Sequence, residues 1–258
     1  MRNIIVALGI GAMASAQPAF AQDDYDRGPE VSITAGVDFS SGDFGTGVDT
    51  EIFVAPLNAR ISTGDFRLNA SIPFIRIKGA ENIVGGDSGP IVVDPNTPIT
   101  TRSGIGDLTL GANYAIPESR FGLGLDFGTR VKLPTAQTGL GTGKTDVSFS
   151  GEVSRTFAMI TPFAQAGYRL MGNPDGFELD NVWFGSVGAS AAVGKSVVLA
   201  SYDYRQSPNA LVEDSQEIFG ALSTPLSRAL DLTFYGSAGL SNGASDYGLG
   251  AMITIKAF

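Results

Sequence analysis

Residues 121–133 read FGLGLDFGTRVKL, and apolar side chains occupy almost every second position of this stretch. The apolar set is Phe121, Leu123, Leu125, Phe127, Val131 and Leu133. The intervening positions hold Asp126, Arg130, Lys132 and three glycines. Successive side chains of a β-strand point to opposite sides, so this period of two predicts a strand with one apolar and one polar face. Its length suits a tilted membrane strand of about 9–11 residues better than a globular strand.

The same alternation recurs past Pro29, most clearly in residues 107–116, 145–157 and 229–240. We predict twelve strands, near residues 30–40, 48–62, 65–78, 105–116, 121–134, 145–158, 160–172, 180–194, 196–207, 214–225, 228–240 and 246–258. The apolar face of the third strand switches around Pro73, which predicts a β-bulge there.

The predicted connections alternate in length along the whole chain. The longer ones span roughly 41–47, 79–104, 135–144, 173–179, 208–213 and 241–245, and the others are tight turns. A barrel with periplasmic N and C termini is connected in this way, with short turns inside and longer loops outside. We therefore predict an all-β, transmembrane antiparallel β-barrel of about twelve strands in the outer membrane. The alternative, a soluble β-sandwich, would have shorter strands and less regular loops.

Residues 1–21 have the pattern of a secretory signal peptide. Arg2 provides a basic start, an apolar run follows, and Ala19-Phe20-Ala21 forms an Ala-x-Ala cleavage site before an acidic stretch. We expect the barrel domain to span residues 22–258. Past this segment, no stretch approaches the roughly 20 apolar residues of a membrane helix.

Composition excludes several kinds of chemistry. The chain has no histidine and no cysteine, and its formal net charge is −9. The acidic balance argues against nucleic-acid binding. Zinc lacks its usual ligands, and a serine hydrolase lacks its usual base, so we expect no metal, no cofactor and no enzyme activity. Residues 139–145 read GLGTGKT, but Thr138 stands where a phosphate-binding loop requires glycine, and a strand follows.

The middle of the chain resembles the outer-membrane family named for the meta-pathway of phenol degradation. The resemblance rests on residues 104–108 (GIGDL), 131–135 (VKLPT), 140–143 (LGTG), Asp146 and 167–169 (GYR). It covers roughly residues 104–170 and is diffuse elsewhere. It implies an outer-membrane barrel that transports small, often aromatic compounds.

If the apolar face meets lipid, the polar face lines the lumen. The predicted lumen-lining residues are Asp107, Asp126, Arg130, Lys132, Glu152, Arg169, Asp203, Arg205 and Asp231, with Lys256 beside them. Charges on the lipid face would be costly, whereas inside they can pair across strands. Two interpretations stay open: a salt-bridge lattice that stiffens the barrel, and a polar opening that passes small solutes.

Residues 79–104 are a candidate plug or lid over the lumen, with a disordered outer loop as the alternative. Glycines and prolines interrupt the segment, and its apolar residues are Ile83, Val84, Ile91, Val92 and Val93. We predict passive passage of small, hydrophobic or aromatic molecules, with a closed structural or surface-interaction barrel as the alternative. Expected partners are membrane lipid and lipopolysaccharide, which acidic loops could bridge through divalent cations. Barrel-insertion machinery, which would recognise the terminal aromatic Phe258, is a further expected partner.

Overall fold

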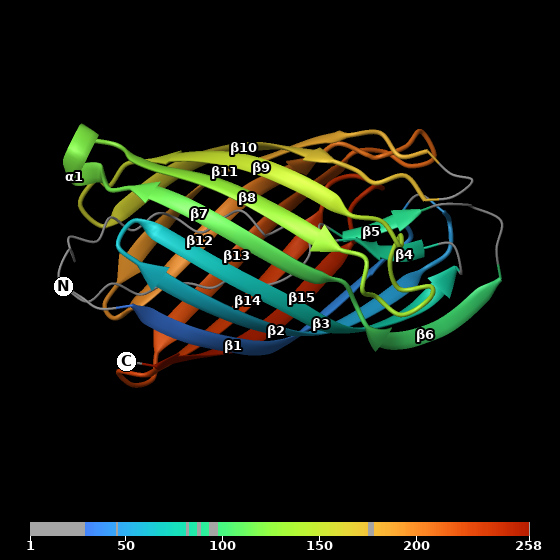
Figure 1. The fold of residues 1–258 in the computed structure, drawn as a ribbon, viewed down its shortest axis with the longest axis horizontal. Helices are drawn as coiled ribbons and strands as arrows, with labels where there is room; N and C mark the ends of the chain where they lie inside the picture. Colours follow the sequence, from blue (N-terminus) through green and yellow to red (C-terminus); the bar gives the residue numbers. More distant parts are fainter. Residues whose placement is uncertain are drawn as a thin grey trace.

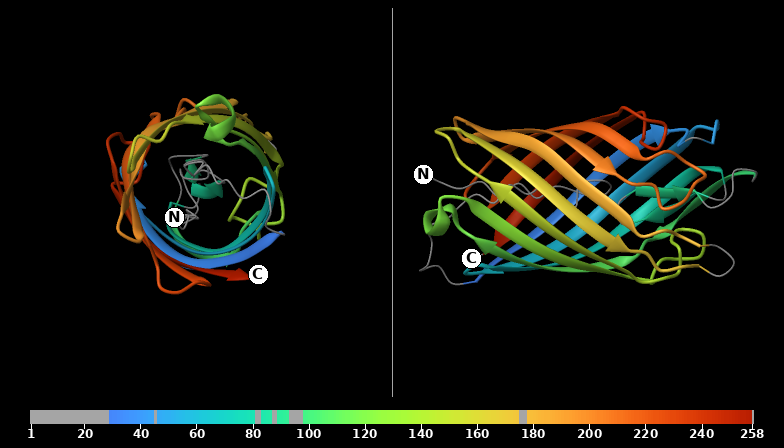
Figure 2. Two further views of the ribbon diagram at one scale, coloured as in Figure 1. Left: turned by 90° about the vertical axis from the view of Figure 1, so that its left-hand side faces the viewer. Right: turned by 90° about the horizontal axis from the view of Figure 1, so that it is seen from above.

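The computed structural model describes residues 29–44, 46–80, 83–86, 89–92, 98–174 and 178–257. The predicted signal peptide and Phe258 lie outside these residues. Figure 1 shows a barrel of tilted strands, and Figure 2 shows that the wall closes into a ring. Among the described residues, no helix has the length and hydropathy to cross a membrane.

Thirteen strands form the barrel wall in one antiparallel sheet. They are β1 (Glu30–Gly42), β2 (Thr50–Thr63), β3 (Phe66–Ala80), β6 (Ile99–Ile105), β7 (Leu108–Ile116), β8 (Gly124–Leu133), β9 (Asp146–Ser154), β10 (Ile160–Leu170), β11 (Val182–Val193), β12 (Ser196–Arg205), β13 (Ser215–Pro225), β14 (Leu230–Gly239) and β15 (Tyr247–Ala257). β6 and β7 pair with successive halves of β3, so together they fill one position, and the ring has twelve positions. The β1–β15 and β2–β3 pairings close it, which confirms the predicted twelve-stranded barrel.

Alternation along each strand separates two environments. On β11, the outward Trp183, Val187 and Val193 are 55–59% exposed, whereas the inward Ser186 and Ser190 are buried. The same pattern holds on β15, where Leu249, Ile253 and Ile255 point outward and Thr254 points inward. A closed wall that is apolar outside and polar inside matches a barrel surrounded by lipid.

Aromatic pairs occupy both ends of the outer face. Tyr168 and Trp183 lie near the loop end, with ring centroids 4.6 Å apart. Phe66 and Tyr114 lie near the turn end, with centroids 4.9 Å apart. Amphipathic rings are favoured at the headgroup level of a bilayer, so these pairs are typical of the two aromatic girdles of a membrane barrel.

The predicted long loop 79–104 was only partly a loop. Its last part is β6, which belongs to the barrel wall. Its middle contains a separate hairpin, β4 (Ile83–Gly86) and β5 (Gly89–Val92). Figure 2 shows this hairpin inside the ring rather than beyond its rim. The sequence analysis missed β6 and the hairpin because this segment is rich in glycine and proline. None of its three strands shows a clean alternation of apolar and polar residues.

The predicted β-bulge does not lie in β3 itself, because β2 and β3 keep one continuous register from Glu51↔Lys78 through Pro56↔Pro73 to Thr63↔Phe66. On the other side of β3, the register shifts by one residue between Ser71↔Thr109 and Phe74↔Ile105, so the extra residue lies opposite Pro73, in the break between β6 and β7. The apolar pattern changes because the inner face itself becomes apolar toward the loop end. There Ile52, Val54, Ile75 and Ile77 point inward and pack with Phe44, Ala80 and Leu140. We call the inner face formed by Ile52, Val54, Ile75 and Ile77 the apolar wall.

The predicted strand 121–134 begins later than expected. Residues Glu118–Phe121 form a single helical turn, α1, which ends at Gly122 in the left-handed conformation, with φ 72°. Arg120 of α1 pairs with Asp65 of the neighbouring turn at 2.9 Å. The glycine supplies the positive φ that ends the turn and lets β8 start.

Candidate functional site

The lumen of the barrel is the candidate functional site. The structure places all nine predicted lumen residues on its inner side. Asp126, Lys132, Glu152, Arg169, Asp203 and Asp231 are buried there, and Arg130 and Arg205 are half-buried. Asp107 lies in the short break between β6 and β7, with its side chain 8% exposed.

The sequence analysis missed further inward charges, among them Asp38, Arg60, Arg67, Asp146 and Glu217. Glu217 and Arg67 lie on strands whose apolar alternation is weak in sequence. Asp146 was visible on the polar face of its run, next to Lys132 in the final register, and could have been included. The others could have been found by counting every second position along each strand from a residue known to point inward, instead of relying on the nearby apolar residues.

Lys132 is the centre of a buried polar cluster at the loop end, which we call the latch. Its Nζ lies 2.8 Å from Asp146 Oδ2 and 3.5 Å from Asp107 Oδ2, and donates to Thr142 Oγ1 at 3.0 Å. The Lys132 side chain is only 2% exposed. A buried ammonium requires such partners, because desolvation without them is costly.

The latch carboxylates also hold backbone from the surrounding loops. The Ala136 N–H donates to Asp107 Oδ1 at 2.8 Å, and the Gly172 N–H donates to Asp146 Oδ1 at 2.9 Å. Asp107, Lys132 and Thr142, from the segments 104–108, 131–135 and 140–143, therefore meet at one point. This shared contact explains the residue types at these three positions.

Two other ion pairs cross the lumenal surface. Arg67 pairs with Asp126, whose Oδ1 also accepts from Asn113 Nδ2 at 2.7 Å. Lys256 pairs with Asp231 at 2.5 Å. These pairs are the salt-bridge lattice that the sequence left open as one interpretation.

Strand register arranges the remaining charges into two rows. Across β8 to β13, Asp126, Glu152, Gln165, Ser186, Asp203 and Glu217 stand directly beside one another. We call this the acidic row. Four residues further toward the loop end, roughly 13 Å along a strand, Arg130 and Arg169 flank Ser148. These acids and the two arginines are therefore separated along the strands.

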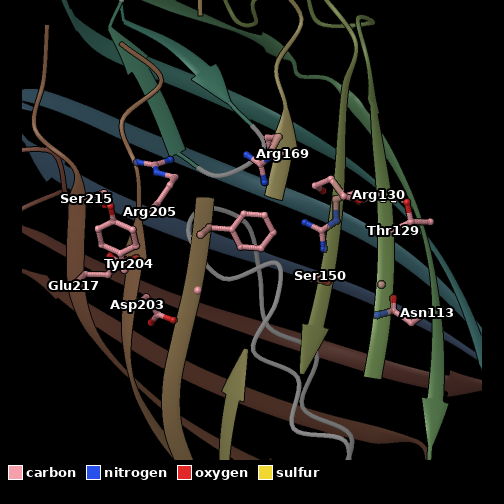
Figure 3. Close-up of a pocket in the computed structure, with 14 residues that line it drawn as sticks. Asn113, Thr129, Arg130, Ser150, Arg169, Asp203, Tyr204, Arg205, Ser215 and Glu217 are labelled. Carbon is pink, nitrogen blue, oxygen red and sulfur yellow. Dashed lines mark hydrogen bonds between the residues drawn. The ribbon is translucent and has the colours of Figure 1, made fainter. Parts of the chain in front are cut away.

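A pocket opens between the two rows. Its lining includes Arg130, Arg169, Arg205, Phe184, Ser150 and Glu217. Figure 3 shows the three arginines along one side, with Asp203 and Glu217 toward the other. Gly128, Ser150 and Gly167 form the intervening register row, so the space there is left by small residues. The lumen therefore contains a polar opening, the second of the two interpretations from the sequence, in addition to the salt-bridge lattice.

The lid candidates belong to the β4–β5 hairpin and the residue after it. Ile91 is buried against Leu179 and Met171, which lie in the connection between β10 and β11. Val93 lies outside the described residues, as do the side chains of Ile83, Val84 and Val92. The hairpin therefore has one defined apolar contact across the lumen from its origin at β3.

In the described part of the chain, no group of three or more histidine, cysteine, aspartate or glutamate side chains is arranged to hold a metal ion. The arrangement provides opposite charges, hydroxyls and the aromatic residues Phe184 and Tyr204 around a space. Such a surface can orient a small polar or amphiphilic solute.

Neither known protein-family models nor curated protein sequences match this chain. The structure is similar to an outer-membrane channel from Pseudomonas putida F1, with a TM-score of 0.70 and 14% identity, over 92% of this chain and 99% of that chain. The transport unit of the autotransporter AIDA-I from Escherichia coli has a TM-score of 0.50 and 12% identity, over 93% and 94% of the two chains. The CymD monoaromatic hydrocarbon channel has a TM-score of 0.45 and 11% identity, over 89% and 88%. These likenesses concern the fold alone. The closed antiparallel barrel with its apolar outer face is the architecture of an outer-membrane protein.

Proposed function

We propose that this outer-membrane barrel is a channel for passive passage of small, hydrophobic or aromatic molecules. The observation that carries the proposal is the lumenal pocket between the acidic row and the arginines, inside a closed wall. A barrel with only a structural role would need paired charges to stiffen its wall, but it would not need an open pocket. The fold shared with the Pseudomonas putida F1 outer-membrane channel supports the same function.

The pocket offers an apolar surface as well as a polar one. The ring of Phe184, on the inner face of β11, is half-buried and lines the pocket beside the arginines. A partly exposed apolar ring among polar groups favours a solute with an apolar part. The meta-pathway resemblance points to the same class of molecule.

The β4–β5 hairpin is the proposed lid. It arises between β3 and β6, and Ile91 reaches the opposite connection at Met171 and Leu179. A single apolar contact of this kind can open at small cost, roughly 1.5–3 kcal/mol for a buried isoleucine. The lid residues Ile83, Val84, Ile91, Val92 and Val93 would then govern access.

The remaining expectations are part of the same proposal. β1 starts and β15 ends at the same end of the barrel, beside the short turns. We assign that end to the periplasm, with residues 1–21 as signal peptide, Phe258 as the contact for insertion machinery, and the longer loops facing lipopolysaccharide. The absence of histidine from the chain supports a function without enzyme activity.

A closed structural or surface-interaction barrel is the second candidate. The latch and the Arg67–Asp126 and Lys256–Asp231 pairs favour it, because they stiffen the wall without contributing to passage. The two candidates differ in whether solutes cross the lumen.

Single-channel conductance in planar bilayers distinguishes them. The informative variant replaces residues 83–92 with a Gly-Ser linker, because removal of 79–104 would also delete β6 from the wall. We expect small current steps from the intact protein and larger steps from the variant. A matched control replaces residues 208–213, a loop that makes no part of the hairpin. Silence from all three proteins would support the structural barrel.

A further inference from the structure

The lumenal pocket has features that suit one class of ligand. Three arginines from β8, β10 and β12 line it, and each is on the inner face of its strand. Arg205 is close enough to Arg169 and to Glu217 for their charges to interact. A guanidinium presents a planar fork of donors that matches a carboxylate better than a point charge does.

An aromatic ring lies among these arginines. The guanidinium carbon of Arg169 is 5.6 Å from the centre of the Phe184 ring. Phe184 is also the register partner of Arg205, so the ring separates the two arginines. A Cβ on Gly167 would collide with the Phe184 ring, which shows that the ring lies over this glycine. The ring is half-buried and therefore still presents area to the lumen.

The other edge of the pocket is acidic. Asp203 and Glu217 are register partners and stand one inward step from Arg205 and Ser215. Asp203 accepts from Ser201 at 2.8 Å. These carboxylates disfavour a ligand with a second negative charge, but they can accept a hydrogen bond from a hydroxyl group. The site thus prefers a single anionic group at one end of the ligand.

We infer that Arg130, Arg169, Arg205 and Phe184 form a binding subsite for an aromatic monocarboxylate inside the lumen. The carboxylate would contact the arginines, the ligand ring would pack against Phe184, and a ring hydroxyl would face Asp203 and Glu217. This rests on the proposed channel function for its biological use, although binding itself does not require passage.

Isothermal titration calorimetry of the refolded full barrel tests the inference with three ring compounds of different charge: sodium benzoate, benzyl alcohol and benzylamine. At neutral pH we expect benzoate to bind at least about tenfold more tightly than benzyl alcohol, because its carboxylate accepts charge-assisted hydrogen bonds from the arginines. Benzylamine should bind no better than benzyl alcohol. Equal binding of benzoate and benzyl alcohol, or tighter binding of benzylamine, overturns the inference.

Variants locate the site. Arg169→Gln should weaken benzoate about tenfold, and Phe184→Ala should weaken both benzoate and benzyl alcohol. Arg60→Gln is the matched control, because Arg60 also points inward but lies on β2, across the ring from β11; its benzoate affinity should stay within about twofold. Arg169→Lys keeps the charge, and should still weaken benzoate several-fold through loss of the planar fork. Unchanged affinity in Arg169→Gln, or equal loss in Arg60→Gln, contradicts the assignment.

Conductance of the same preparations in potassium chloride separates the two proposals. Current without benzoate preference refutes the subsite and leaves the channel. Benzoate preference without current refutes passage and leaves the subsite.

Discussion

The inner surface of the barrel differs between two regions. A band across β8 to β13 carries the acidic row and the arginines around a pocket. On β2 and β3, at the loop end, the apolar wall replaces charge with Ile52, Val54, Ile75 and Ile77. The polar region can orient a charged group, whereas the apolar wall is buried against Phe44 and Leu140. The difference indicates that polar residues line the open space of the lumen, while inward apolar residues hold the loops against the barrel wall.

The largest expected effect tests the polar side. Lys132→Met leaves Asp107 and Asp146 without their buried cation, and we expect the free energy of unfolding to fall by about 3–5 kcal/mol. Equilibrium unfolding in urea in lipid vesicles measures it. Combining Lys132→Met with Asp107→Asn and Asp146→Asn should recover much of the loss, because no uncompensated charge remains.

The control for this variant is Lys78→Met. Lys78 pairs with Glu51 at 3.2 Å, but both side chains are about half exposed, at 53% and 48%. Such a pair contributes about 0–1 kcal/mol. Equal losses in the two variants would show that the latch is no more important than a surface pair.

The apolar side is tested by Ile77→Ala. Ile77 is fully buried in the cluster with Phe44 and Leu140, so truncation should leave a cavity and cost about 2–4 kcal/mol. Ile72→Ala, on the outer face of the same strand, is the matched control. Lipid can fill the space left at position 72, so Ile72→Ala should lower the free energy of unfolding clearly less than Ile77→Ala. A larger loss of unfolding free energy for Ile72→Ala than for Ile77→Ala, measured by urea unfolding, would contradict the assignment of Ile77 to the inner face and Ile72 to the outer face.

This contrast also shows what the sequence could predict. Strands such as residues 121–133 alternate between lipid and polar lumen, so their faces were assigned correctly, and their inward charges followed. In β3, the pattern is reversed near the loop end, where Ile75 and Ile77 point inward and Arg76 and Lys78 point outward. A sequence rule that assigns apolar residues to the lipid face therefore fails there, because Phe44 and Leu140 from distant loops cover the inward apolar residues.

The site was predictable to a similar extent. Inward positions of Arg130 and Arg169 follow from parity within each strand. Their grouping with Arg205 and Phe184 depends on the register between strands, which the tight turns constrain only to within a residue or two. The hairpin of β4 and β5 was not predictable, because four-residue strands carry too few alternations to be distinguished from loop.

The outer surface gives a third test. Val187 lies near the middle of β11 and is 55% exposed toward lipid. Val187→Arg should destabilise the barrel by about 2–4 kcal/mol in vesicles, because a charge at the bilayer midplane is costly. Phe121→Arg, in α1 at the turn end, should cost only about 0–1 kcal/mol. Equal effects would indicate that the outer face is not embedded as described.

A smaller effect is expected beside the latch. The Thr135 hydroxyl accepts a hydrogen bond from the Leu108 N–H at 2.8 Å, where β7 begins. Thr135→Val removes this acceptor while keeping the shape, and should cost about 1 kcal/mol. Urea unfolding measures the change, with Thr138→Val in the same loop as control. A loss as large as that of Lys132→Met would mean that the hydroxyl, and not the ion pairs, holds the loop.

The most direct test of an aqueous lumen uses the absence of cysteine from the chain. Ser150 is an inward residue of the pocket, whereas Val187 faces outward. In each case a single cysteine is introduced, as Ser150→Cys and Val187→Cys, and reacted in vesicles with a charged, water-soluble thiosulfonate while current is recorded. We predict rapid modification and a reduced current for Ser150→Cys, with Val187→Cys unchanged. Modification of Val187→Cys alone, or of neither variant, would contradict a water-filled passage through this barrel.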